Sequence, residues 1–282
     1  MTVFYIVCAG VAAGMIAALL YWRFYNNQKH LRLRGLKQIH QVKQLTEQMQ
    51  KHRGLSAAML NGHHNSASQQ AELAQTINRT LEKIDDMHVY ERWQSISDHW
   101  ARLSGNIPVL TPANSFKQHS QLIGSLLFLI EEIATASHLA SKQFANFKEL
   151  DWYWREILLL EESVGQARAL GTGVATLKVC ARVEHIQLSY LRNSITQVAE
   201  KAFAELIQNE KRQPVPDERT ALMQACVKQT RYLCAVIEHE LVNKKNIEID
   251  AEQYFKLASD CMNSFDLIFS QKLQEIEAYL NQ

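Results

Sequence analysis

Glycine and proline are scarce in this sequence, with 10 and 4 respectively among 282 residues. Glycine weakens helices because it has more backbone freedom to lose, and proline breaks them because it lacks the amide hydrogen. Their scarcity, together with abundant Leu, Ala, Gln, Glu and Lys, is typical of helical proteins. Hydrophobic residues make up 47% of the chain, which is enough for a core. We therefore predict an all-α protein built as an extended helical bundle.

Cysteine pairs and an excess of charge are also missing. The five cysteines contain no C-x-x-C pair and are odd in number, which is a poor disulfide framework and favours a reducing compartment. The formal net charge is only +1. The chain as a whole therefore gives no electrostatic reason to expect nucleic acid as a partner.

Signatures of catalysis are missing as well. HELVN, residues 239–243, lacks the second histidine of a zinc-protease motif, and no glutamate has a histidine three residues later. GTGVAT, residues 171–176, lacks the third glycine of a dinucleotide-binding loop. His63 and His64 are adjacent in a polar turn, where histidines are usually solvated. The sequence predicts no enzyme, no metal site and no cofactor.

Long apolar runs are absent except at the N-terminus. Residues 1–22 carry no charged side chain, and as a helix they would be roughly 33 Å long, enough to cross a hydrocarbon core of about 30 Å. Five basic residues follow: Arg23, Lys29, Arg32, Arg34 and Lys37. By the positive-inside rule we expect a single span in the inner membrane, with the rest of the chain in the cytoplasm. A periplasmic domain is the alternative.

Small residues in this predicted span suggest how two copies could associate. Gly10 and Gly14 form a G-x-x-x-G pattern, which lets two membrane helices approach closely. We predict a possible homodimer through this face. The predicted organisation is a transmembrane helix over 1–22, a juxtamembrane stalk over 23–35 and an all-helical domain over 36–282.

Beyond the span, apolar residues keep a helical period without interruption to Asn61 and Gly62, which predicts one long helix entering the domain. Breaks in the later pattern separate six further predicted helices, over residues 66–103, 115–146, 149–177, 181–212, 217–244 and 250–282. The connections are short. We therefore expect one helical domain on one anchor.

Two arginines lie on faces that these helices should bury. Arg53 follows Leu45 and Met49 at helical spacing, and Arg168 follows Ile157 and Val164 in the same way. Small residues come after both arginines. Arginine carries a permanent positive charge and a planar set of donors that suits flat oxyanions.

Two interpretations of these arginines remain open. Buried arginines are normally paired, so Arg168 could bind Glu161, and Arg53 a carboxylate on a neighbouring helix. The alternative is that both arginines converge on a small anion whose binding draws the helices together.

Two segments resemble a known family. LTEQMQKHRGLSAAML, residues 45–60, is similar to the first motif of the nitrate- and nitrite-sensing (NIT) domain, which reads roughly L-Q-x-E-R-G-x-S-A. ESVGQARALGTGVA, residues 162–175, resembles its later E-x-x-G-x-x-R-A-L-G motif. The resemblance extends from about Leu36 to at least Ser194. It implies two joined up-down bundles in which arginines from different helices bind nitrate or nitrite between them.

The resemblance also implies roles for individual residues. Arg53 and Arg168 would be the anion ligands, and Ser56 belongs to the same motif as Arg53. His52 stands where relatives often have a charged residue, and it would be a titratable substitute. Arg231 is the candidate for a further arginine on a late helix, with Arg192 second.

Members of this family usually precede an output module, and none follows Gln282 in this sequence. We therefore expect a membrane-anchored sensor that binds nitrate or nitrite and signals to a separate protein partner. The alternative function is a helical interaction scaffold that keeps the fold without the ligand. A third is the input half of a complex whose output lies on another chain.

Overall fold

The computed structural model describes the backbone of residues 2–62, 66–84, 86–210 and 217–282. Side chains are described over the same ranges except at residues 2–11, 13, 202, 205–210 and 217–219. Every regular element in these ranges is helical, which confirms the all-α prediction.

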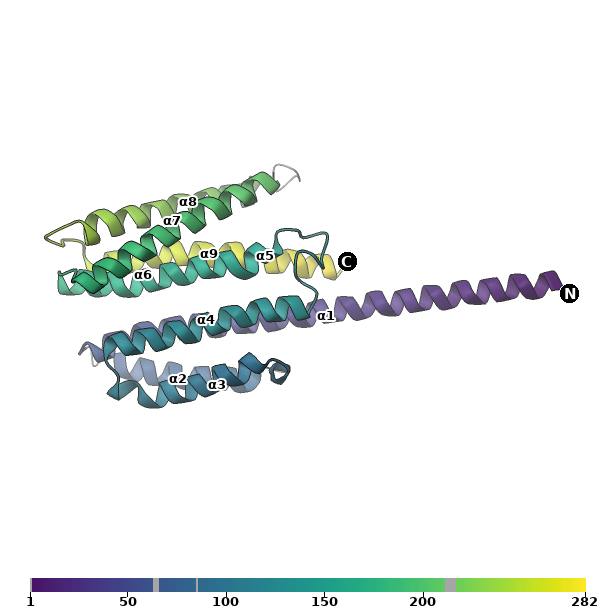
Figure 1. The fold of residues 1–282 in the computed structure, drawn as a ribbon, viewed down its shortest axis with the longest axis horizontal. Coiled ribbons are helices and arrows are strands. Elements are labelled where there is room, and N and C mark those ends of the chain that lie inside the picture. The colour runs from purple at the N-terminus through teal and green to yellow at the C-terminus, as the bar shows by residue number, and fades with distance from the viewer. Residues whose placement is uncertain (1, 63–65, 85, 211–216) are drawn as a thin grey trace.

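The first half of the chain forms one bundle of four helices (Figure 1). They are α1 (Thr2–Leu60), α2 (Ser66–Lys83), α3 (Glu91–Asn106) and α4 (Pro112–Ala136). Two 3-10 turns, η1 (Met87–Val89) and η2 (Ile107–Val109), connect its later members. α1 packs most extensively against α4, and both lie on the side of this bundle that faces the second half of the chain (Figure 1).

The second half forms another bundle (Figure 1). The short α5 (Leu150–Trp152) and the π-helical turn η3 (Tyr153–Ile157) lead into α6 (Leu158–Leu177). α7 (Arg182–Glu210) and α8 (Asp217–Val236) follow. A second π-helical turn, η4 (Ile237–Val242), and a loop then lead to α9 (Ala251–Leu280), whose N-cap Asp250 accepts hydrogen bonds from the amides of Glu252 and Gln253.

The helices are stacked as four layers of pairs: α2 with α3, α1 with α4, α6 with α9, and α7 with α8 (Figure 1). The two inner pairs meet along a seam, where α1 contacts α6 and α9 and α4 contacts α6 and η3. The apolar core continues across this seam, from Ile39 and Leu45 on α1 to Ile157 and Phe269 on the other side. The two bundles are therefore one packed unit.

Two predicted helices were wrong in their extent. The helix predicted over 66–103 is broken near Asp86, which adopts a left-handed conformation with φ 59°, and α3 begins only at Glu91. The helix predicted over 115–146 begins earlier, because the Thr111 side chain caps it ahead of Pro112. It ends at Ala136, and His138 has φ 55°. Short polar side chains tolerate this backbone region better than branched ones.

α1 extends far beyond the bundle, so that its N-terminal part has no neighbouring helix in the described chain (Figure 1). Large apolar side chains are exposed there, among them Leu20, Trp22 and Phe24 at 62%, 62% and 63%. Over the part of the chain that is described, no helix has a segment long and apolar enough to cross a membrane. Of the span predicted over 1–22, residues 1–11 and 13 have side chains that lie outside the described residues, and Gly10 is one of them.

Candidate functional site

Charged and polar side chains interrupt the apolar core along the seam. Lys43, Gln50 and Arg53 project from α1 toward α6, where Glu161 and Glu162 meet them. We call this set, together with Arg168 on α6, the polar seam. Its four ionic members apart from Arg168 are each 5% exposed or less. Buried charges are tolerated only when they are paired and hydrogen-bonded, so their partners decide what the seam can do.

One end of the polar seam is organised by Lys43. Its ammonium group lies 3.2 Å from Glu161 and 2.8 Å from Glu47, and it also pairs with Asp266 on α9. Burial alone would lower the pKa of Lys43, but these three carboxylates raise it overall. Burial in turn raises the pKa of Glu161, against the pull of Lys43. Lys43 is thus a structural tie between α1, α6 and α9.

The other end holds Arg53, which is 1% exposed. Its Nη1 and Nη2 donate to the two oxygens of Glu162 at 2.5 and 3.2 Å, and Nη1 also donates to Ser120 Oγ on α4 at 3.0 Å. The guanidinium lies 5.4 Å from the ring centre of Phe116. The Nε of Arg53 is buried and has no hydrogen-bond partner among the described residues. Arg53 is therefore already paired with a carboxylate, and it still has one donor, Nε, to offer.

A glycine allows this arrangement. A Cβ at Gly165 would lie 3.1 Å from Arg53 Nη2 and 3.3 Å from the Met262 methyl carbon. Such contacts are tighter than ordinary van der Waals packing. The glycine of the second motif is therefore what lets the guanidinium approach the backbone of α6.

Arg168 is held differently. Its Nη1 donates to Ser259 Oγ on α9 at 3.0 Å, and its guanidinium lies 4.9 Å from the ring centre of Phe255. Within the described part of the chain it makes no ion pair, and Glu161, the partner proposed from the sequence, pairs with Lys43 instead. Burial and then the positive charge of Arg53 lower the pKa of Arg168. The two arginines are thus within electrostatic range of each other across the seam.

His52 takes part in a hydrogen-bonded chain inside the first bundle. Its Nε2 lies 2.7 Å from Gln70 Nε2, and its Nδ1 lies 2.8 Å from His119 Nε2. His119 Nδ1 lies 2.7 Å from the Ser115 carbonyl oxygen. A carbonyl can only accept, so each ring donates through Nδ1, and the chain runs from Gln70 through both rings to Ser115.

His52 and His119, the two histidines of this hydrogen-bonded chain, are neutral. Burial, followed by the neighbouring ring, lowers the pKa of His52 to about 3. Burial also lowers the pKa of His119 to about 4. His52 packs edge-on against Trp100 of α3, and Ser56 lies 3.4 Å from His52 Nδ1. The structure therefore places His52 and Ser56 in the interior of the first bundle, while the adjacent Arg53 faces the seam.

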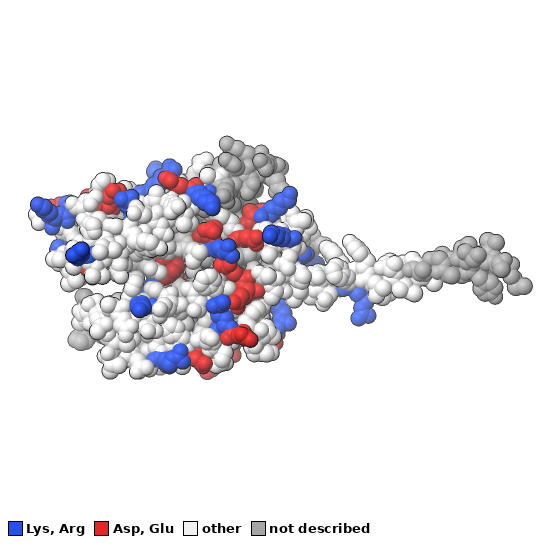
Figure 2. All heavy atoms as spheres, viewed as in Figure 1, with Lys and Arg blue, Asp and Glu red and all other residues white. Residues whose placement is uncertain are grey.

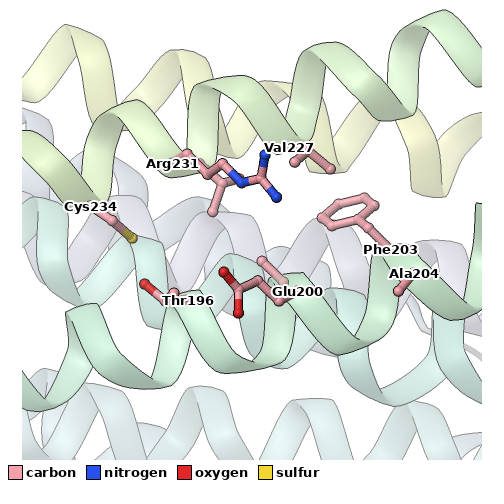
Figure 3. Close-up of a pocket in the computed structure, with 9 residues that line it drawn as sticks. Thr196, Glu200, Phe203, Ala204, Val227, Arg231 and Cys234 are labelled. Carbon is pink, nitrogen blue, oxygen red and sulfur yellow. The ribbon is translucent and has the colours of Figure 1, made fainter.

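Arg231 lies elsewhere, in a cavity of about 200 Å³ between α7 and α8 in the outer layer. Figure 3 shows its guanidinium on the side facing Glu200, with Phe203 and Val227 forming the apolar wall. All the residues that line this cavity come from α7 and α8, so the structure does not bring Arg231 to the polar seam. Arg192, the second candidate, pairs with Glu238 at 2.9 Å.

Several contacts of the candidate site could not be predicted from the sequence. Glu162 stands in the second motif, but nothing in the pattern assigned it to Arg53. Lys43, Gln70 and His119 carried no signal beyond lying on helical faces. Over the described residues, no group of three or more His, Cys, Asp or Glu side chains is arranged to hold a metal ion. His63 and His64 lie outside the described residues.

The fold and the polar seam define a class: a domain of two helical bundles in which buried charged side chains of the two bundles pair across a shared interface. The chain belongs to the nitrate and nitrite sensing (NIT) family, whose model matches residues 44–277. Among solved structures, the structure of the NasR transcription antiterminator is similar, with a TM-score of 0.62 at 16% identity. The similarity covers 95% of this chain and 76% of that one. Comparison with curated proteins gave no match.

Proposed function

We propose that this chain is a sensory domain that binds a small oxyanion, nitrate or nitrite, in the polar seam between Arg53 and Arg168. Membership of the nitrate and nitrite sensing family supports a sensor rather than an enzyme. The similar antiterminator structure supports the fold alone.

One observation carries the proposal: two arginines from opposite bundles act on each other electrostatically across the seam, and of the two only Arg53 pairs with a carboxylate in the described chain. Glu162 pairs with Arg53, whereas Arg168 has a hydroxyl and an aromatic ring as neighbours. The unpartnered Arg53 Nε is a buried donor, and such donors normally find an acceptor. A planar anion offers acceptor oxygens to both guanidinium groups at once.

Binding would act as a signal because the two arginines belong to different bundles. An anion that contacts both would stabilise the arrangement in which α1 and α6 are close, and shift the equilibrium toward it. α1 runs without interruption from Arg53 to its far N-terminal part. A change in the packing of α1 at the seam would therefore reach the exposed end of the helix and a protein partner there.

Calorimetric titration of residues 30–282 with nitrate and nitrite tests the proposal, with chloride and sulfate as control anions. We expect saturable heat with nitrate or nitrite, and none in Arg168→Ala, whose fold is checked by circular dichroism. Arg168 makes no ion pair in the described chain, so its removal should leave the bundles intact. Absence of heat with every anion would contradict the proposal.

A second candidate function is an interaction scaffold that keeps the fold without binding an anion. The direct pairing of Arg53 with Glu162 favours it, because an internal counter-ion already neutralises the more buried arginine. The same titration separates the two functions. A folded protein that releases no heat with any anion would make the scaffold the better account.

We further propose that α1 anchors the domain to a membrane. The first acidic residue of the chain is Glu47, and the described part of the α1 extension shows basic but no acidic side chains in Figure 2. An apolar segment followed by basic residues is typical of a cytoplasm-facing anchor. After cell lysis, the full chain should resist carbonate extraction from membranes, and residues 30–282 should not. Equal extraction of both would contradict the anchor.

A further inference from the structure

We infer that Glu162 determines the valence of the anion that the polar seam accepts, so that the site selects monovalent over divalent oxyanions. This inference rests on the proposed function, because it concerns the selectivity of the same site. It goes further in assigning a role to a residue that does not need to touch the anion.

The hydrogen bonds of Glu162 hold its carboxylate in place. Oε1 accepts from Arg53 Nη1 at 2.5 Å and from Gln166 Nε2 at 2.9 Å. Oε2 accepts from Gln50 Nε2 at 3.0 Å and from Arg53 Nη2 at 3.2 Å. Four donors around a carboxylate that is 5% exposed hold it firmly in place.

The other carboxylates near the seam act on Arg168 electrostatically as well, but in the described chain their direct ion pairs are with another cation. Glu161 and Asp266 both pair with Lys43, and Asp266 has a side chain that is 32% exposed and therefore screened by solvent. Glu162 is thus the buried carboxylate that contacts a seam arginine in the described chain. Together, Arg53, Arg168 and Glu162 carry a single net positive charge.

A single buried positive charge is balanced by a monovalent anion. Nitrate or nitrite would leave the group neutral, whereas sulfate would leave an uncompensated negative charge in a poorly solvated place, which is unfavourable. The hydrogen bonds of Arg53 agree with separate places for Glu162 and for the anion. Glu162 occupies the terminal Nη1 and Nη2 atoms of Arg53, and Nε on the side of the guanidinium is the donor without a partner.

The test compares the ratio of nitrate to sulfate affinity in the wild type and in Glu162→Gln, by calorimetry on residues 30–282. Glutamine keeps the size and one acceptor oxygen of glutamate but removes its charge. We expect the wild type to prefer nitrate, and we expect this preference to fall by about tenfold or more in Glu162→Gln, because sulfate gains more than nitrate. The matched control is Glu238→Gln, which removes the partner of Arg192 in the outer layer and should leave the ratio unchanged.

A second variant tests the same charge balance from the other side without altering Glu162. Ser259→Asp would place a carboxylate beside Arg168, where the serine hydroxyl now accepts its hydrogen bond at 3.0 Å. The net charge of the site would then be zero, and nitrate affinity should fall by about tenfold or more. Ser259→Asn has the same shape without the charge and should keep most of the affinity.

The outcomes separate this inference from the proposed function. If the wild type binds no anion, the proposed function fails and takes the inference with it. If the wild type binds nitrate, but a folded Glu162→Gln keeps the same preference over sulfate, the inference alone is overturned. Should Glu162→Gln not fold, unchanged nitrate binding by Ser259→Asp would overturn it equally.

Discussion

Arg53 and Arg168 belong to opposite bundles and act on each other electrostatically, yet the protein holds them in different ways. Arg53 is almost completely buried and shares its guanidinium with Glu162 and Ser120. Arg168 is half-buried and contacts Ser259 and the Phe255 ring. The first arrangement contributes to the stability of the bundles. The second leaves a positive charge available, and this is where we place the capacity to respond to an anion.

Because of this difference, the two interpretations that the sequence left open do not apply equally to both arginines. For Arg53 the structure supports the internal ion pair, with Glu162 as the partner. For Arg168 it does not, because Glu161 is held by Lys43. An arginine on a buried face therefore does not by itself indicate a structural or a ligand-binding role. Its partner on the neighbouring helix is what distinguishes the two roles.

The largest expected effect comes from breaking the Arg53 pair. Arg53→Met leaves Glu162 buried without its cation, and we expect the free energy of unfolding to fall by about 3–5 kcal/mol. The double variant Arg53→Met/Glu162→Gln should recover most of this loss, because it removes both charges. Urea unfolding followed by circular dichroism measures both. Equal losses in the single and double variants would show that Glu162 is not the partner that matters.

A second expected effect is acid sensitivity of the first bundle. The folded pKa values of His52 and His119, about 3 and about 4, lie below the ordinary value of 6.5, so the unfolded state binds more protons between these limits. Stability is then fully present above pH 6.5 and is lost as the pH falls. We expect each histidine to contribute a loss of about 1.4 kcal/mol between about pH 7.5 and about pH 5.5.

Chemical unfolding at the two pH values measures this effect. The double variant His52→Gln/His119→Gln should flatten the dependence on pH. His185, an exposed residue of α7, provides the control, and His185→Gln should leave the dependence unchanged. A wild-type stability that does not change over this range would contradict the neutral histidine pair.

A smaller effect is expected from two neighbouring glycines of α6. A Cβ at Gly171 would lie 2.3 Å from ring atoms of Tyr254, whose hydroxyl donates to the Ala167 carbonyl oxygen at 2.9 Å. Gly171→Ala should therefore destabilise by about 1–3 kcal/mol. Gly173 has open space around it, and Gly173→Ala should be neutral or stabilise by up to about 1 kcal/mol. Thermal unfolding of both variants tests the contrast, and equal effects would contradict it.

The smallest loss of stability is expected for Arg168. Arg168→Met removes one hydrogen bond and a ring contact but breaks no ion pair in the described chain, so the free energy of unfolding should fall by about 1 kcal/mol or less. Urea unfolding beside Arg53→Met gives the comparison directly. A loss as large as that of Arg53→Met would mean that Arg168 is also a structural residue.

The sequence predicted the helices and the inward direction of both arginines, because helical spacing alone determines which side chains share a face. It did not predict the pairing of Arg53 with Glu162, which lie 109 residues apart and meet only when the two bundles pack. The break near Asp86 was missed because a left-handed residue leaves no hydrophobic pattern. Arg231 was a candidate because it lies on a late helix. That helix, α8, belongs to the outer layer, so Arg231 does not reach the polar seam.

A crystal structure of residues 30–282 grown with nitrate tests the central claim most directly. The account predicts a nitrate ion in the polar seam, within hydrogen-bond distance of both Arg53 and Arg168, with Glu162 still paired to Arg53. A nitrate found beside Arg231 between α7 and α8, or a seam in which Arg168 remains on Ser259 with no anion near it, would contradict the account.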